Sequence, residues 1–179
     1  MMKLFNYLEC NNVEEISDKI YAYLQDHTTI LDEPMNRNWR PLDLDILDQV
    51  PELAEFFSNL NLEPNVIHVL RTCETRNLHV DYNPEPRIMF PVRNTVGTAV
   101  TNFYDLTDFI KIPVHVEHYI YYKIFFTSQK LIGSYTLDRP VVFNPNVPHQ
   151  VVHDVVATTP RIALTIGFKN PPTELLLGD

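Results

Sequence analysis

The hydrophobic pattern changes at Pro64, and this change limits the folds open to the chain more than any other feature. After Pro64, apolar residues recur at every second position in short runs rich in Val, Ile, Phe and Tyr, which is the period of β-strands. The predicted strands cover residues 66–72, 78–82, 88–93, 100–104, 114–126, 141–143, 150–156 and 161–168. Because no helical pattern separates them, they predict a β-sandwich or barrel rather than alternating strands and helices.

The first third of the chain has a helical period instead. Apolar residues at helical spacing predict helices over residues 13–24 and 51–60, with a short turn near 42–47. The length of 179 residues and the 45% hydrophobic content are those of one ordinary globular domain. We therefore expect a single, mainly β domain over 1–179, in which residues 1–64 form a helical support packed on one sheet of a jelly roll built from residues 65–170.

Composition and charge exclude several classes of function. The net charge of −9 and the absence of a run of Lys and Arg disfavour a nucleic-acid partner. Only four glycines are present and none are clustered, so the chain has no glycine-rich phosphate loop or dinucleotide fingerprint. No stretch approaches the roughly 20 apolar residues of a membrane span, and no signal-peptide pattern opens the sequence. We expect a cytoplasmic protein without a membrane partner.

A group of candidate metal ligands falls on the predicted strands. His79 and Asp81 are alternate residues of one strand, so their side chains share a face, and His149 opens a later strand directly after Pro148. Two imidazoles and one carboxylate on one side of a metal leave the other side open, as a non-haem Fe(II) centre requires. His153 lies on the same strand face as His149 and is the alternative third ligand.

Other polar residues are candidates for cosubstrate binding. Arg161 begins the last predicted strand, where its fork of donors can hold a carboxylate through two hydrogen bonds. Asn94, Asn102 and Tyr104 fall on strands that are expected to line the same cavity. The alternative, that Asn94 forms a turn and that the other two are ordinary strand residues, stays open.

With its ligands in this order, the chain resembles the 2-oxoglutarate and Fe(II) dependent oxygenases, whose double-stranded β-helix carries His-x-Asp/Glu, a distal His and then an Arg. The resemblance covers roughly residues 66–168. The chain is similar to small phage and bacterial members of this family in four segments: His79-Val80-Asp81, the strand 88–94, the loop with Gly97 and the strand 102–104. Residues 143–153 also look like part of aspartyl/asparaginyl hydroxylase domains. The resemblance implies a cupin-like jelly roll with N-terminal helices.

The resemblance also implies roles for individual residues. His79, Asp81 and His149 would bind Fe(II), and Arg161 would pair with the distal carboxylate of the cosubstrate 2-oxoglutarate. The expected activity is a dioxygenase reaction that hydroxylates a small molecule or a protein side chain. Many members carry Ser or Thr where this chain has Ala163, so one hydrogen bond to the cosubstrate is either absent or supplied by Thr165 or a tyrosine.

A second function is open to this chain: a non-catalytic jelly-roll module for binding or structure, which keeps the fold, with or without a metal, and has no turnover. The sequence does not identify a substrate; we expect specificity to lie in the loops 83–87 and 126–137, and Arg87 and Arg93, which share a strand face, to meet either an anionic substrate or water. If the chain forms a homodimer, the contact is expected at the tyrosine-rich strand near residue 120.

Overall fold

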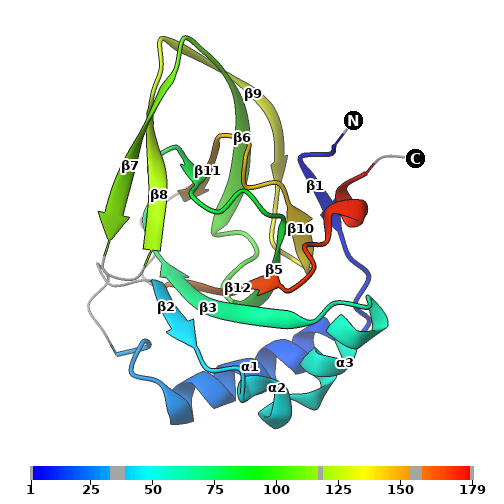
Figure 1. Ribbon diagram of the computed structural model, residues 1–179. Helices are drawn as coiled ribbons and strands as arrows, with labels where there is room; N and C mark the ends of the chain where they lie inside the picture. Colours follow the sequence, from blue (N-terminus) through cyan, green and yellow to red (C-terminus); the bar gives the residue numbers. More distant parts are fainter. Residues whose placement is uncertain (1, 33–38, 117–118, 154–158, 178–179) are drawn as a thin grey trace.

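The computed structural model describes residues 2–32, 39–116, 119–153 and 159–177, and it contains two six-stranded antiparallel sheets (Figure 1). We call the first the helix-backed sheet; its strands, in spatial order, are β1 (Phe5–Tyr7), β10 (Val141–Phe143), β5 (Arg87–Arg93), β12 (Arg161–Phe168), β3 (Pro64–Thr72) and β2 (Trp39–Leu42). The opposite sheet has the order β7 (Ile110–Val116), β8 (Tyr119–Phe125), β4 (His79–Asp81), β11 (His149–His153), β6 (Ala99–Thr107) and β9 (Ser128–Tyr135).

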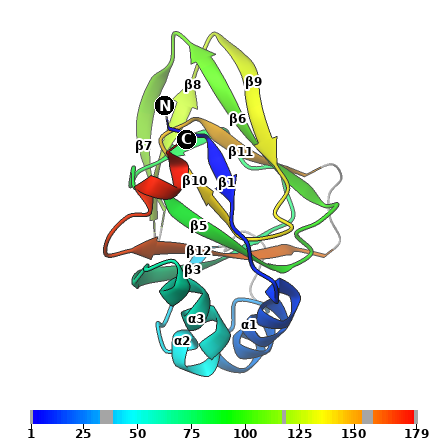
Figure 2. The ribbon, with the colours of Figure 1, turned by 90° about the vertical axis from the view of Figure 1, so that its right-hand side faces the viewer.

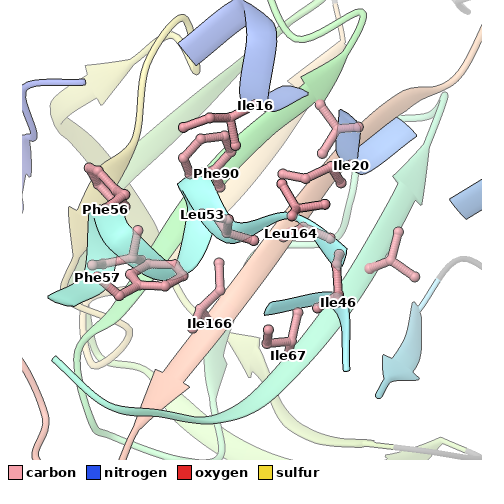
Figure 3. Packing of buried hydrophobic residues seen from close by; sticks show 14 of the residues in the cluster. Ile16, Ile20, Ile46, Leu53, Phe56, Phe57, Ile67, Phe90, Leu164 and Ile166 are labelled. Atoms are coloured by element: carbon pink, nitrogen blue, oxygen red, sulfur yellow. The ribbon is translucent and has the colours of Figure 1, made fainter. Parts of the chain in front are cut away.

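The helices α1 (Val13–His27), α2 (Ile46–Gln49) and α3 (Pro51–Asn59) cover the outer face of the helix-backed sheet, as Figures 1 and 2 show. A short 3₁₀ helix, η1 (Thr173–Leu176), follows the last strand. Proline is tolerated in the first turn of α3 because an N–H there has no partner within the helix. Figure 3 shows the apolar side chains of the helices packed on those of the sheet; the labelled ones are Ile16, Ile20, Ile46, Leu53, Phe56, Phe57, Ile67, Phe90, Leu164 and Ile166.

Strand β12 is covered on both faces, and all eight of its residues are buried. Ile162, Leu164 and Ile166 belong to the core beneath the helices. Ala163 belongs to a second, smaller core between the two sheets. A central strand covered on both faces reads as a continuous apolar run, which explains the sequence of β12. The two polar side chains that interrupt it, Arg161 and Thr165, both lie on the face toward the opposite sheet.

The predicted fold class is confirmed at the level of a mainly β protein with two antiparallel sheets and few helices. Two strands of the helix-backed sheet were not predicted. Strands β1 and β2 lie at the two edges of the helix-backed sheet, so residues 1–64 are not purely helical. The short length of β1 and the proline in β2, which an edge strand tolerates, explain why no strand pattern is visible there.

Two other expectations about strands were wrong. The predicted single strand 114–126 belongs to two antiparallel strands, β7 and β8. The predicted loop 126–137 contains β9, in which Leu131 and Ile132 are adjacent and both exposed, so that the period of two is lost. The predicted continuation of β11 to residue 156 lies outside the described residues.

The opposite sheet exposes large apolar side chains on the strands far from the helices, including Ile110 of β7, Phe125 of β8 and Leu131 of β9. The homodimer contact near residue 120 stays a prediction. In the part of the chain that the structure describes, no helix is both long and apolar enough to cross a membrane.

Candidate metal centre

Sheet register brings three predicted ligands together. His79 of β4 and His149 of β11 are directly opposite each other, and Asp81 lies two residues along β4. The Nε2 atoms of His79 and His149 lie 3.6 and 3.8 Å from Asp81 Oδ1, and one ligand atom from each of the three residues lies within 4.8 Å of the others. Ligand atoms that are each about 2 Å from one ion are separated by about 3 to 4 Å. The group could therefore hold a metal ion.

Each imidazole is oriented by the backbone carbonyl group of the residue two positions before it. The Nδ1 of His79 lies 2.8 Å from the carbonyl oxygen of Asn77, and the Nδ1 of His149 lies 2.9 Å from that of Val147. Because a carbonyl oxygen only accepts, the proton is assigned to Nδ1, and Nε2 keeps a lone pair that faces Asp81. Burial, followed by the neighbouring His149, lowers the pKa of His79 to about 4, so this ring is neutral at neutral pH.

The alternative ligand, His153, lies apart from this group. It is four residues beyond His149 on β11, a separation of about 13 Å along a strand. Its side chain is buried, with Nε2 3.2 Å from the hydroxyl of Thr72, and its backbone N–H donates to the hydroxyl of Thr75 at 3.0 Å. The structure thus brings His149, rather than His153, to His79 and Asp81.

A pocket of about 370 Å³ lies beside the metal ligands, and both sheets line it. The opposite sheet contributes the three ligands, and the helix-backed sheet contributes Arg161 and Thr165, which are two of the predicted cosubstrate residues. The volume lies within the range of about 300 to 1,000 Å³ that is usual for small-molecule sites. One cavity therefore joins the candidate metal site to the predicted carboxylate-binding arginine.

Arg161 is buried without a countercharge. Its side chain is on β12, the residue is 3% exposed, and its Nε has no hydrogen-bond partner. Among residues 2–32, 39–116, 119–153 and 159–177, no carboxylate forms an ion pair with it. Burial lowers the pKa of Arg161 below its ordinary value, and the nearby Tyr135 opposes this effect. A buried, unpaired guanidinium is costly, and an anion bound in the pocket would satisfy it.

Tyr135 is a pocket residue that the sequence reasoning missed. It is the last residue of β9, is 3% exposed and lines the pocket. Burial raises the pKa of its phenol, and the positive charge of Arg161 acts in the opposite direction. The signal that could have found it is the alternation of Gly133, Tyr135 and Leu137 with polar residues inside the segment predicted as a loop.

Asn94, Asn102 and Tyr104 are not among the residues that line the pocket. Asn94 has a positive φ of 52° and donates a side-chain hydrogen bond to the carbonyl of Pro160 at 2.9 Å, so it forms a turn. Asn102 donates to the hydroxyl of Tyr104 at 3.2 Å on the outer side of β6. The inward positions of β6 are the alternate ones, among them Thr101. These three residues therefore lie outside the pocket, which corrects the expectation that they contact the cosubstrate.

No protein-family model matches this chain, and no curated protein sequence matches it. The assignment of the site rests on the geometry of its residues.

Proposed function

We propose that the protein is a dioxygenase dependent on Fe(II) and 2-oxoglutarate that hydroxylates an unidentified small molecule or protein side chain. The observation that carries this proposal is that one pocket is lined both by His79, Asp81 and His149 and by the unpaired, buried Arg161. Two histidines and one carboxylate on one side of an open site are the ligand set of non-haem Fe(II) oxygenases. A keto acid with a second carboxylate needs a metal and a cation within one cavity.

The strand order supports a double-stranded β-helix as the fold that carries this site. Without the edge strands β1 and β2 and the pair β7 and β8, eight strands remain. In chain order they are β3, β4, β5, β6, β9, β10, β11 and β12. The helix-backed sheet then holds the sixth, third, eighth and first of these, and the opposite sheet holds the second, seventh, fourth and fifth. Neighbours in each sheet are mostly distant in sequence, as in jelly rolls built from Greek keys.

The polar side chains of the pocket fit both Fe(II) and 2-oxoglutarate. Fe(II), when bound with 2-oxoglutarate and dioxygen, supplies the oxidising chemistry of hydroxylation. The chain's own residues hold and orient: the two Nε2 atoms and the Asp81 carboxylate would hold the ion from one side, and Arg161 would hold the distal carboxylate. Thr165 and Tyr135 line the same pocket, and either would supply the hydroxyl that Ala163 lacks. Met89 and Phe143 add apolar surface to the pocket wall.

An anaerobic titration tests the proposal. Fe(II) is added to the metal-free protein with and without 2-oxoglutarate, and visible absorbance is followed. We expect a charge-transfer band that requires both additions. His79→Ala should abolish the band, and Arg161→Ala should raise the 2-oxoglutarate concentration needed for it by about tenfold or more, because a charge-assisted hydrogen-bonded pair is lost. Arg139→Ala, at an exposed arginine outside the pocket, is the matched control.

Two results would contradict the proposal. Binding of the metal without any band that depends on 2-oxoglutarate would favour the non-catalytic binding module. An unchanged requirement for 2-oxoglutarate in Arg161→Ala would show that Arg161 does not hold the cosubstrate.

A further inference from the structure

The pocket carries more positive charge than the proposed function uses. The whole chain has a net charge of −9, yet Asp81 is the one carboxylate among the described residues that line the pocket. Three arginines, Arg76, Arg87 and Arg161, line it as well. Of the two carboxylates of 2-oxoglutarate, one would chelate the metal and the other would pair with Arg161. Arg87 is left without a role in the cosubstrate site.

Arg87 and His68 both line the pocket from the helix-backed sheet, and the charge of Arg87 acts on His68. Arg87 begins β5, and His68 is on β3; β12 runs between these strands, with Thr165 paired to both His68 and Met89. Burial, followed by the charge of Arg87, lowers the pKa of His68 to about 4, so its imidazole is neutral at neutral pH. The Nδ1 of His68 is buried without a hydrogen-bond partner. Within the described ranges, no carboxylate forms an ion pair with Arg87.

A β-bulge separates Arg87 from Arg93, which the sequence placed on the same face. The register between β12 and β5 shifts between Ile162 and Ala163, so one extra residue of β5 is accommodated. Arg93 therefore faces the helices, where it forms an ion pair with Asp18, and its guanidinium lies over the ring of Tyr21. Of these two arginines, only Arg87 lines the pocket.

Aromatic side chains line the pocket beside His68 and beside the metal ligand His79. The ring of Trp39 lies 4.7 Å from that of His68, and the ring of Tyr121 lies 5.7 Å from that of His79, between ring centroids. Tyr82 also lines the pocket. Such walls favour a flat or apolar body and fix it through ring contacts.

We propose, on the basis of the proposed function, that the primary substrate has an aromatic or apolar body and a single oxyanion, either a carboxylate or a phosphate. Arg87 and His68 bind the oxyanion, and Trp39 and Tyr121 flank the body, which points toward the metal. Arg87 is then the residue that determines specificity. A guanidinium suits this task because it holds an oxyanion through paired hydrogen bonds.

Binding to the metal-free protein tests this subsite. The probes are phenylacetate and phenyl phosphate, with phenylacetamide as the neutral match, and hexanoate with hexanamide as the aliphatic pair. Affinities are measured by saturation-transfer NMR for the wild type, Arg87→Gln, Arg87→Lys, Arg161→Gln and Arg139→Gln. We expect an oxyanion probe to bind about tenfold more tightly than its amide, and Arg87→Gln to remove that preference. Arg87→Lys should keep part of it, and Arg139→Gln should keep all of it.

Three outcomes would overturn the subsite: no oxyanion probe binds, acid and amide bind equally, or the preference disappears in Arg161→Gln and persists in Arg87→Gln. Thermal unfolding of each variant shows whether it is folded. Because no metal or cosubstrate is present, this experiment can succeed or fail independently of the Fe(II) and 2-oxoglutarate titration. The relative affinities of phenylacetate and phenyl phosphate identify which oxyanion the subsite prefers.

Discussion

Two histidines that line the pocket, His68 and His79, are uncharged at neutral pH. Burial is the main cause that lowers the pKa values of His68 and His79 to about 4. A neutral imidazole is the form that binds a metal and that offers one donor and one acceptor nitrogen. Protonation therefore begins to compete for these rings only in acid, well below the ordinary histidine value near 6.5.

This effect predicts how stability depends on pH. The folded protein resists protonation of His68 until about pH 4, whereas the unfolded chain takes up that proton near 6.5. The contribution of His68 is thus fully present above about pH 6.5 and is lost as the pH falls toward 4, with a slope of at most about 1.4 kcal/mol per pH unit. Urea unfolding of the metal-free protein across this range, compared with His68→Gln, measures it. Parallel stability curves for the two proteins would contradict the prediction.

The sequence was sufficient to find the residues whose chemistry and strand position agree. His79, Asp81 and His149 could be predicted because strand parity puts the first two on one face and Pro148 marks the start of the strand of the third. Parity alone does not say which face of a strand points inward, so it could not decide whether Asn102 contacts the cosubstrate or, as the structure has it, lies on the outer side of β6. It also fails across a bulge, as with Arg93.

At the scale of elements, the two faces of β12 have different roles: one packs in the core beneath the helices, and the other lines the pocket. Leu164 faces the helices, whereas Thr165, the next residue, lines the pocket. Leu164→Ala should lower the free energy of unfolding by about 2 to 5 kcal/mol, since it leaves a cavity in the core. It should leave the affinity for 2-oxoglutarate unchanged.

Thr165→Val is the matched change on the other face. It should alter stability by no more than about 1 kcal/mol and weaken 2-oxoglutarate binding by about threefold to tenfold, the range expected for one hydrogen bond. Denaturant unfolding and the anaerobic titration measure the two effects. If both variants changed both quantities to the same extent, the two faces of β12 would not act independently.

The elements themselves could be predicted only where their pattern is regular. The helices α1 and α3 and the inner strands have apolar residues at a constant period, because each packs one or both faces in a core. Strands β1, β2 and β9 are held mainly by pairing at sheet edges. Their side chains are partly exposed, so their sequences carry little periodic signal.

At the scale of the whole molecule, the proposed metal ion would join parts of the chain that are distant in sequence. His79 and Asp81 come from β4, and His149 comes from β11, and these strands share one registered residue pair. The unfolded chain does not hold these three groups together, so the proposed ion would bind the folded state alone. At a free Fe(II) concentration about 100 times the dissociation constant, binding should stabilise the fold by about 2.7 kcal/mol.

For a chain of this length, that stabilisation corresponds to an increase in Tm of about 5 to 10 °C. Anaerobic thermal unfolding with and without Fe(II) measures the shift. Asp81→Asn should lose most of it, because the neutral amide supplies no charge to the ion, whereas His115→Gln, at an exposed histidine of β7, should keep it. The same shift in Asp81→Asn and in the wild type would mean that the ion binds elsewhere. If the shift is lost in Asp81→Asn but kept in His115→Gln, the ion binds between β4 and β11 and stabilises the opposite sheet by linking these two strands.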